Sequence, residues 1–564
     1  MKYVHFLVNI TQNEYNNFIK IFFLIFILVI DYSLFAQEIY IRANQLGYLP
    51  SDKKQAIIFT NSKIDNTKFT VNNFYTGDNI ITDNLKSPIG SYGKFKNCYK
   101  IDFSKIKSAG KYYIEINGTK SYTFSINNYI YNNLVDSLLT FFKIQRCGFN
   151  EPYLHEFCHY YDATKLILNG IELDGKNDLT GGWHDAGDYL KFLNTIAYTS
   201  YTLLFSYDFD NSKFSKDQNN NGLPDILDEA KIGINWLIKA NYNDQYLVTQ
   251  VQDLQDQRVG WRLPENDPLI NNRPAYLGIG KNLIGIYSSA LALAYRIFNE
   301  FPDENDFANT CLDIAEKFYS LNPKSPDIYR TPTGHYEDSK YLGKLSLSAI
   351  ELYLSTHKNN YLVDAKKYAN EAASDFWWSW GDINSFAHFR LAKIDTSFKK
   401  YIFSNLKHFR ELSNKNILGE VINDAWGTNN TNLGVALQTI LWQNITNDFT
   451  FNDLAIKQRD YILGKNPWGI SFIYNIGSKF TKHFHSQIAY FNNGKLPGAL
   501  SAGPISKVKL SQYNIILENS NDPYEAFQTD EVIYQDDRMD YITNEPTITA
   551  NATAVFVFAF YSNR

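Results

Sequence analysis

Residues 111–126 read KYYIEINGTKSYTFSI and contain two runs in which apolar and polar side chains alternate. This period of two is typical of a β-strand with one buried face, and the Asn117-Gly118 pair between the runs is a strong hairpin signal. Runs of the same kind, separated by turn residues, extend back along the chain to Ile39. We therefore predict an N-terminal β-sandwich of immunoglobulin type over residues 37–127.

The pattern changes after Asn127, where long segments with a helical period replace the short alternating runs. Irregular loops rich in Gly, Asn, Pro and Trp separate these segments, and long loops in a compact domain usually carry function. We predict a multidomain protein in which an all-α domain over residues 128–564 follows the sandwich. Its antiparallel helix pairs would suit a closed double ring. The expected helices are 225–240, 283–301, 305–321, 345–355, 361–376, 432–442, 453–463 and 547–561.

The first residues have the pattern of an export signal. Residues 21–30 form an apolar run behind Lys20, and a short segment ending at Ala36 precedes polar Gln37. This arrangement predicts a signal peptide over residues 1–36 and a secreted or periplasmic mature protein. The run is shorter than the ~20 residues that span a bilayer, so no stable membrane span is expected after cleavage. The alternative is an uncleaved anchor.

The composition fits a globular protein with a large core, since 44% of the residues are hydrophobic and 20% are charged. A net charge of −5, from 54 basic and 59 acidic residues, gives no indication of nucleic-acid binding. Aromatic residues reach 16%. Flat aromatic faces suit sugar rings, although the coding bias of an AT-rich genome explains the same excess.

The first chemical motif is the segment Gly181–Tyr189, GGWHDAGDY. It places two carboxylates, Asp185 and Asp188, three residues apart among glycines and aromatic residues, so that both point into one small space. Like charges at this range cost free energy unless they share a water, a proton or a cation. The alternative is a solvated acidic turn, which would need neither Trp183 nor the glycine pair.

The second motif is the segment 534–552, in which Glu545 stands beside Tyr541 at the start of an apolar C-terminal helix. Partial burial there would raise the pKa of Glu545 and keep it protonated near neutrality, as a general acid requires. The helix N-terminus would lower the same pKa. A glutamate at a helix start is also an ordinary capping residue, so both interpretations stay open at this point.

Four residues suggest a zinc site. Cys147, Cys158, His159 and His184 offer two thiolates and two imidazoles, a donor set that suits a closed, structural tetrahedral site. A metal bound to His184 would brace the loop that carries the two aspartates. The alternative is a disulfide between the two cysteines, which an exported protein can form.

A calcium loop is expected in the segment 217–228, DQNNNGLPDILD, which has oxygen donors at the required spacing, glycine at the sixth position and an acidic twelfth residue. The alternative is an Asn-rich turn before a helix. The expected ligands are Asp217, Asn219, Asn221, Leu223 and Asp228.

The segments 181–189, 463–485 and 534–552 together resemble glycoside hydrolase family 9, the inverting cellulase-type family. Residues 43–50, ANQLGYLP, resemble the start of the immunoglobulin-like module that precedes many of its catalytic domains. The resemblance covers nearly the whole mature chain and implies an (α/α)6 barrel whose open end carries a sugar-binding cleft. The C-terminal signature matches at Tyr534, Asp536, Tyr541, Glu545, Thr547, Asn551 and Ala552.

The resemblance implies a role for each carboxyl. Asp188 would be the general base that deprotonates the attacking water, Asp185 its partner in holding that water, and Glu545 the acid that protonates the glycosidic oxygen. Inversion needs room for a water, so the acid and base carboxyls are expected about 6.5–9.5 Å apart. Because Asp188 and Glu545 are so distant in sequence, they can meet only if the barrel closes.

The resemblance also implies ligands: it favours zinc over the disulfide and calcium in the segment 217–228, with no organic cofactor. Two positions depart from the family. Gln487 stands where the family has arginine, and residues 342–348, LGKLSLS, replace an Asp-Glu-x-Trp-Ala-Ala pattern. These departures leave the acid and the base unchanged but leave the glucan open. The expected sugar contacts are Trp183, Trp426, His485, Gln487 and Tyr541.

The sequence therefore predicts an exported endoglucanase that hydrolyses a β-1,4-glucan polysaccharide or oligosaccharide with inversion. Three alternatives stay open. An exo-acting relative of β-glucosidase or β-glucosaminidase type would remove single sugars from oligosaccharides. A non-catalytic carbohydrate-binding protein would keep the cleft without turnover, and an adhesin would bind through aromatic residues on the exposed face of the sandwich.

Overall fold

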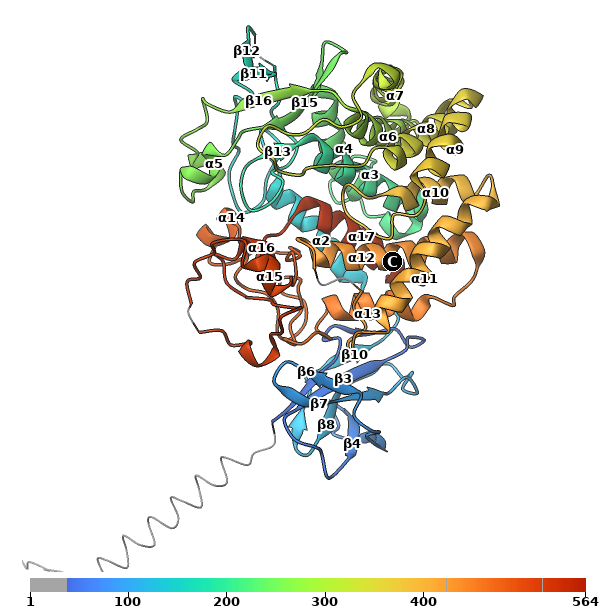
Figure 1. Ribbon diagram of the computed structural model, residues 1–564, viewed down its shortest axis with the longest axis vertical. Helices are drawn as coiled ribbons and strands as arrows, with labels where there is room; N and C mark the ends of the chain where they lie inside the picture. The colour runs from blue at the N-terminus through green and yellow to red at the C-terminus, as the bar shows by residue number, and fades with distance from the viewer. Residues whose placement is uncertain (1–37, 176, 422–423, 520) are drawn as a thin grey trace, which may run out of the picture.

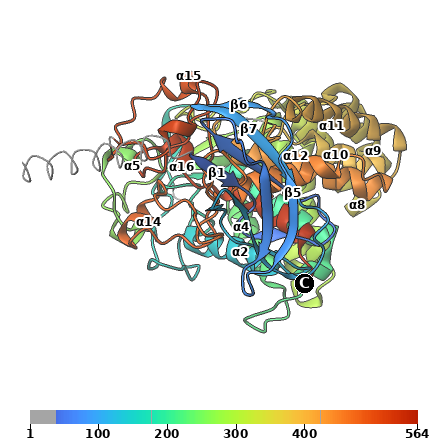
Figure 2. The ribbon, with the colours of Figure 1, turned by 90° about the horizontal axis from the view of Figure 1, so that it is seen from below.

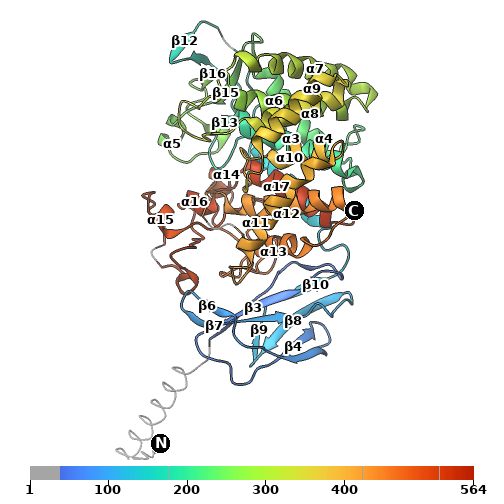
Figure 3. The same cartoon turned by 45° about the vertical axis from the view of Figure 1, so that its right-hand side comes forward.

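The computed structural model describes residues 38–175, 177–421, 424–519 and 521–564. The predicted signal peptide, residues 1–36, lies outside the described residues. Two units stack along the long axis, with the strands of the N-terminal unit at one end and the helices beyond them (Figure 1, Figure 3). Within the described ranges, no helix is both long and apolar enough to cross a membrane.

Two sheets form the N-terminal unit. One has the strand order β1 (Ile39–Arg42), β3 (Gln55–Thr60), β7 (Phe95–Asp102), β6 (Gly90–Tyr92). The other has the order β2 (Gly47–Tyr48), β10 (Phe124–Ile126), β8 (Gly110–Ile116), β4 (Lys68–Asn73), β5 (Asn79–Asn84), and β9 (Thr119–Lys120) pairs with β8. Asn117 and Gly118 join β8 to β9 with φ values of 47° and 79°, as the predicted hairpin requires. The predicted immunoglobulin-like sandwich is confirmed.

The C-terminal unit is a double ring of helices. The inner helices contact one another in a closed circle: α3 (Leu193–Phe209), α6 (Lys281–Phe298), α8 (Leu342–Thr356), α10 (Asn384–Ala392), α12 (Thr428–Thr446) and α17 (Ile548–Tyr561). The outer helices pack against the outside of this ring, several of them on two neighbouring inner helices: α2 (Asn132–Gln145), α4 (Asp225–Lys239), α7 (Asn305–Ser320), α9 (Asn359–Ala372), α11 (Lys399–Ser413) and α13 (Asn452–Ile462). The predicted (α/α)6 barrel is therefore confirmed.

Burial explains which helices form the inner ring. In α17, all residues except Phe560 are buried, and the segment is apolar on every side, as a helix surrounded by others must be. The outer helix α7 buries one face only. Because α17 packs on both α2 and α3, the end of the chain closes the ring against its beginning.

Several elements of the barrel domain are absent from the sequence prediction. Helices α2, α3, α10 and α11 were not expected. In α3, only the last three residues are not buried, so this helix has no polar face. Without a polar face, the sequence lacks the periodic signal on which a helix prediction rests. A sheet was also missed, with the order β12 (Ile171–Leu173), β11 (Lys165–Leu168), β16 (Pro274–Gly278), β15 (Tyr246–Val251), β13 (Lys191–Phe192), and β14 (Asn241–Tyr242) pairs with β15.

Four short helices lie in the loops of the barrel: α5 (Gln255–Arg258), α14 (Gln487–Phe491), α15 (Lys507–Leu510) and α16 (Tyr541–Asn544). In Figure 1, α14, α15 and α16 lie on the same side of the barrel. Since the sequence associates Gln487, at the start of α14, and the segment that contains α16 with function, we expect the site on this side.

Buried polar contacts join the two units. The Arg459 guanidinium bonds the Asp52 carboxylate at 2.9 Å, and Asn44 donates to Asp460 at 2.9 Å. The amide of Gln45 donates to the Gly469 carbonyl at 2.7 Å. Seen from below, the sandwich strands β1 and β7 lie in front of the barrel (Figure 2). The segment 43–50 that resembles the family module thus supplies two of these contacts with the barrel.

Candidate active site and metal-binding cluster

The segment Gly181–Tyr189 lies between α2 and β13 and is fixed by the end of α2. The side-chain amide of Gln145, at the C-terminus of α2, donates to the carbonyls of His184 and Ala186 at 3.0 and 2.6 Å. The Asp185 N–H donates to the Leu190 carbonyl at 3.0 Å. These bonds hold the loop in a tight turn, so the two aspartates have fixed positions.

Three distant segments meet at Gly187. Its N–H donates to a Glu545 carboxyl oxygen at 3.1 Å, and its carbonyl accepts from the Gln487 N–H at 3.1 Å. A Cβ at this position would lie 2.0 Å from the His485 carbonyl oxygen, so only glycine permits the approach. Ring closure therefore brings the predicted acid, Glu545, to the loop that carries Asp185 and Asp188.

The three carboxyls differ in their surroundings. Asp185 is 1% exposed, its Oδ2 accepts from the Tyr336 hydroxyl, and its Oδ1 has no hydrogen-bond partner among the described residues. Asp188 and Glu545 are each partly exposed. Burial raises the pKa of Asp185 to about 6, although the nearby Thr195 side chain and the Tyr336 hydroxyl oppose this shift.

The pKa of the other two carboxyls rises further. Burial raises the pKa of Asp188 to about 7, and the charges of Asp256 and Asp185 act in the same direction. Burial and the charge of Asp188 raise the pKa of Glu545 well above its usual range, although the Gly187 N–H opposes this. A group of carboxyls that share one space in this way holds a proton near neutrality, which supplies an acid next to a base.

A row of rings lies beside the carboxyls. From Tyr490 it runs through Trp261, His485 and Tyr541 to Trp426, with centroid separations of 5.2, 5.2, 5.7 and 5.7 Å. Trp426 is 49% exposed. The Nδ1 of His485 bonds the Arg538 carbonyl at 2.7 Å, and burial lowers the pKa of His485, so its imidazole is neutral. Rings with exposed faces and adjacent polar groups suit the two surfaces of a sugar.

Three predicted sugar contacts, Trp426, His485 and Tyr541, belong to this row, and two do not. The prediction for Trp183 is wrong: the side chain is 0% exposed and its indole N–H donates to Glu229 at 2.8 Å, so no ring face is open to a ligand. Gln487 is nearly buried beside the row, and its side-chain oxygen accepts from the Arg262 N–H at 3.0 Å. A role of Gln487 toward a sugar stays a prediction.

Sequence reasoning missed Tyr336 and left Trp261 unassigned. Tyr336 lies in an irregular loop before α8, far from every motif, and reaches Asp185 only through the fold. Trp261 contacts His485 edge-on. Its sequence signal was a tryptophan beside glycine in a long loop, which several other tryptophans share.

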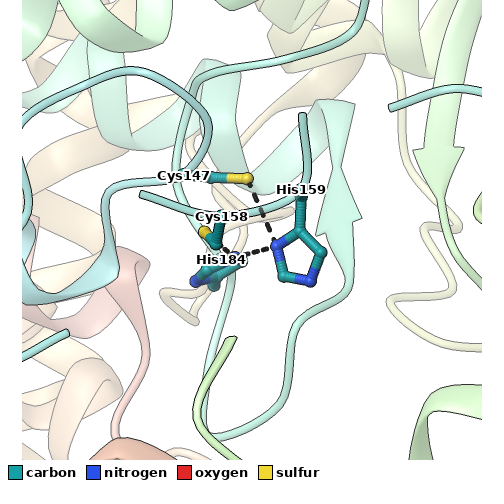
Figure 4. Close-up of side chains that lie close together, drawn as sticks. All are labelled: Cys147, Cys158, His159 and His184. Atoms are coloured by element: carbon teal, nitrogen blue, oxygen red, sulfur yellow. Dashed lines mark hydrogen bonds between the residues drawn. The ribbon is translucent and has the colours of Figure 1, made fainter. Parts of the chain in front are cut away.

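The cysteine and histidine residues converge into one buried cluster (Figure 4). The ligand atoms of Cys147, Cys158, His159 and His184 all lie within 4.8 Å of one another. Cys147 Sγ is 3.7 Å from His159 Nδ1, Cys158 Sγ is 3.9 Å from His184 Nε2, and the two nitrogens are 3.1 Å apart. All four cysteines of the chain are free thiols, so the alternative disulfide does not form here.

The surroundings of this cluster also suit a metal ion. His159 Nε2 bonds the Asp267 carboxylate at 3.0 Å, which is the usual arrangement behind a ligating histidine. Burial raises the pKa of Cys147, but the hydrogen bond from Cys158 and the charge of Lys191 outweigh it and bring the pKa well below its usual value. The residues therefore form a cluster that can hold a metal ion.

The predicted calcium loop precedes α4 and is exposed. The Asn219 and Asn221 amides donate to the two Asp228 carboxylate oxygens, each at 2.8 Å. The Asp217 carboxylate accepts from the N–H groups of Asn221 and Gly222 at 3.2 and 2.9 Å. The predicted ligand side chains thus lie together, and calcium binding there stays a prediction.

Paired carboxyls beside a row of rings, on the loops of an (α/α)6 barrel, define an enzyme that acts on carbohydrates. The protein belongs to glycosyl hydrolase family 9, whose family model matches residues 131–558. The model of the cellulase N-terminal immunoglobulin-like domain matches residues 36–121. The predicted family is therefore confirmed, and the chain is a glycoside hydrolase.

Individual relatives cover nearly the whole chain. A xyloglucan-specific endo-β-1,4-glucanase of Bacteroides ovatus is 25% identical over 91% of this chain and 92% of its own length. The crystal structure of a metagenome-derived family 9 endoglucanase has a TM-score of 0.80 at 23% identity, covering 93% of this chain and 99% of that chain. A zinc-binding triple mutant of another family 9 endoglucanase has a TM-score of 0.79 at 22% identity, covering 91% and 99%.

Proposed function

We propose that the protein is an exported endo-β-1,4-glucanase that inverts the anomeric carbon, with Glu545 as general acid and Asp188 as general base. The observation that carries this assignment is the convergence of the three carboxyls, in which Glu545 meets Gly187 of the aspartate loop. Asp188 and Glu545 are partly exposed, whereas Asp185 is buried. The two outer carboxyls can therefore touch a substrate, and Asp185 can hold a water between them.

The reaction follows from these positions. Glu545 gives its proton to the glycosidic oxygen as the bond to the anomeric carbon breaks, and a water attacks the opposite face of that carbon. Asp188 takes the proton of this water, and the free Asp185 Oδ1 accepts its second hydrogen bond. The new hydroxyl has the inverted configuration. After product release, proton exchange with solvent returns Glu545 to its acid form and Asp188 to its base form.

The row from Tyr490 to Trp426 supports a polymeric glucan as the substrate. It extends on both sides of His485 and therefore offers places for sugar units beyond the one that reacts. The relative that acts on xyloglucan adds support for a β-1,4-glucan, decorated or plain. An exo-acting enzyme would need the row blocked at one end, whereas Trp426 remains 49% exposed at the end of the row.

A substrate panel tests this proposal. The purified protein is incubated with carboxymethyl cellulose, mixed-linkage glucan, xyloglucan and chitosan oligomers, and viscosity is compared with reducing-sugar release. Endo cutting of a β-1,4-glucan thins the polymer early, whereas exo cutting releases sugar first. Proton NMR of the first products identifies the anomer, and retention of configuration would overturn the assignment of Asp188 as a base.

We infer that the metal of the cysteine and histidine cluster is zinc. A tetrahedral zinc ion with bonds of about 2.0–2.3 Å separates its ligand atoms by about 3.3–3.8 Å, close to the separations of the four donors. With four protein ligands the site would be structural, and it would brace His184 and the adjacent aspartates.

We also propose calcium binding at 217–228 and export through residues 1–36. Metal analysis and a calcium-dependent shift in melting temperature test the two metals, and N-terminal sequencing of the exported protein tests the third.

A further inference from the structure

A second surface of the barrel domain has the chemistry of a sugar site. A pocket of about 640 Å³ lies beside the metal-binding cluster and shares no lining residue with the carboxyls or the row from Tyr490 to Trp426. Its lining includes three exposed rings, Phe149, Tyr160 and Tyr161, with 66%, 38% and 59% of their surface accessible. We name it the Tyr161 pocket. Exposed rings gathered around one pocket are typical of a binding site, whereas single exposed rings are common on protein surfaces.

The rings form an apolar face on one side of the pocket. The centroids of Phe149 and Tyr160 are 5.1 Å apart at an interplanar angle of 40°. A β-bridge between Gly148 and Cys158 fixes the base of the loop that carries Phe149. Because the backbone at both ends of this loop is held, the position of Phe149 is preorganised, which reduces the entropy cost of binding.

The rest of the lining is polar but carries no unpaired charge among the described residues. Lys239 bonds the Asp178 carboxylate at 2.8 Å, and Asp162 is paired with both Lys191 and Arg273 at 2.7 and 2.5 Å. An ionic ligand would therefore find no free counter-charge. The lining therefore does not favour a nucleotide or an acidic peptide as the ligand.

Free hydrogen-bonding groups complete the lining. The Asn271 amide and the Tyr161 hydroxyl make no hydrogen bond to another described residue, and the Asn177 amide uses only its nitrogen, on the Lys239 carbonyl at 3.2 Å. The pocket thus offers apolar faces, neutral donors and acceptors, and charges that are already paired. A glucan chain has the complementary surface, since its rings present flat C–H faces edged with uncharged hydroxyls.

We propose that the Tyr161 pocket is a second, non-catalytic binding site for the neutral β-glucan chain. The identity of the polymer rests on the proposed function, whereas the existence of the site rests on the pocket alone. By holding the polymer at a second point, the pocket would raise the effective concentration of glucan at the carboxyls. Long chains, but not short oligosaccharides, would gain from it.

Affinity electrophoresis in gels that contain soluble mixed-linkage glucan tests the proposal. All variants carry Glu545→Gln so that the gel is not digested. Adding Phe149→Ala and Tyr161→Ala is expected to weaken retardation about tenfold, because two ring contacts are lost. Tyr161→Ala alone should weaken it about threefold. The matched control adds Tyr129→Ala and Phe449→Ala, which remove two rings of similar exposure, 64% and 60%, elsewhere on the surface.

Equal retardation of the double variant and its control, with melting temperatures that match the parent, would overturn the proposal. Should the double variant melt lower, Tyr161→Ala decides, since a side chain that is 59% exposed contributes little to folding. The catalytic assignment is measured separately, as reducing-sugar release from the same glucan by the unmodified protein. Retardation lost on ring removal together with no hydrolysis would leave the second site standing and the proposed function refuted.

Discussion

The segment Gly181–Tyr189 supplies neighbouring residues to two buried clusters of opposite character. His184 belongs to a cluster of thiol and imidazole groups within 4.8 Å of one another, which a cation can satisfy. Asp185 belongs to a group of carboxyls whose pKa values are all raised, and one of its oxygens lacks a partner among the described residues. One cluster therefore collects complementary ligand groups that fix the loop, whereas the other tolerates like charges so that a proton and a water can be held.

The carboxyl cluster is expected to control turnover and to matter little for folding. Glu545→Gln and Asp188→Asn should each lower kcat by about a thousandfold, because proton transfer to the leaving oxygen or from the water is lost. Initial rates on a soluble β-glucan measure this. Glu172→Gln, at a carboxylate that is 61% exposed, is the matched control and should keep full activity. Substantial activity of Glu545→Gln would remove Glu545 from the acid role.

The meeting point of the three segments gives the next largest effect. Gly187→Ala places a methyl group 2.0 Å from the His485 carbonyl oxygen and 3.2 Å from a Glu545 oxygen. The loop must move, and a displacement of about 1 Å costs about a hundredfold in rate. We expect this loss in kcat with metal content unchanged. Gly381→Ala, at a glycine whose φ is not positive and whose added Cβ would meet its nearest atom at 3.4 Å, an ordinary contact, is the control for the general effect of the substitution.

The metal-binding cluster should affect turnover by fixing the position of the loop that carries Asp185. Cys158→Ala is expected to abolish zinc binding, lower the melting temperature and reduce kcat about tenfold, because the loop that carries Asp185 loses its brace. Zinc content by mass spectrometry of the native protein is the decisive measurement. Cys311→Ala, at a buried cysteine outside the cluster, is the control for loss of a thiol. Full activity in a protein free of zinc would show that the carboxyl cluster does not depend on the metal-binding cluster.

The two clusters also differ in what the sequence could reveal. Local residue patterns singled out Asp185, Asp188, Glu545 and the four metal-binding candidates, and the family resemblance supplied the roles of the three carboxyls. Tyr336 could not be found, since its contact with Asp185 exists only after the barrel loops are placed. The wrong assignment of Trp183 has the same cause: whether a ring faces a ligand or Glu229 depends on packing. The β-sandwich and the helical domain followed from periodicity and the (α/α)6 barrel from the family resemblance, whereas α3 was lost because a helix buried on nearly all sides has no polar face.

The pH dependence of activity tests whether the pKa of Asp188 lies above that of an ordinary aspartate. Asp188 must be ionised to act as a base, and burial raises its pKa to about 7. Activity should therefore fall as the pH drops through this value, by about fivefold between pH 7 and pH 6. The acidic limb of kcat/KM against pH measures this effect. An acidic limb near pH 4, the ordinary range of an aspartate, would contradict the raised pKa of Asp188.

The smallest effect is on stability, and its sign follows from the raised pKa of Glu545. Because the folded-state pKa exceeds the unfolded one, this group stabilises the fold at low pH and loses that contribution as the pH rises through the folded-state value. In the variant Glu545→Gln, the side chain at this position carries no charge at any pH. The melting temperature of this variant should match the parent in acid and exceed it by a few degrees in alkaline buffer, as measured by differential scanning calorimetry. Glu172→Gln, at an exposed carboxylate outside both clusters, is the matched control. A lower melting temperature for Glu545→Gln at high pH would mean that the ionised carboxylate is stabilised where it lies, and the contrast between the two clusters would fail.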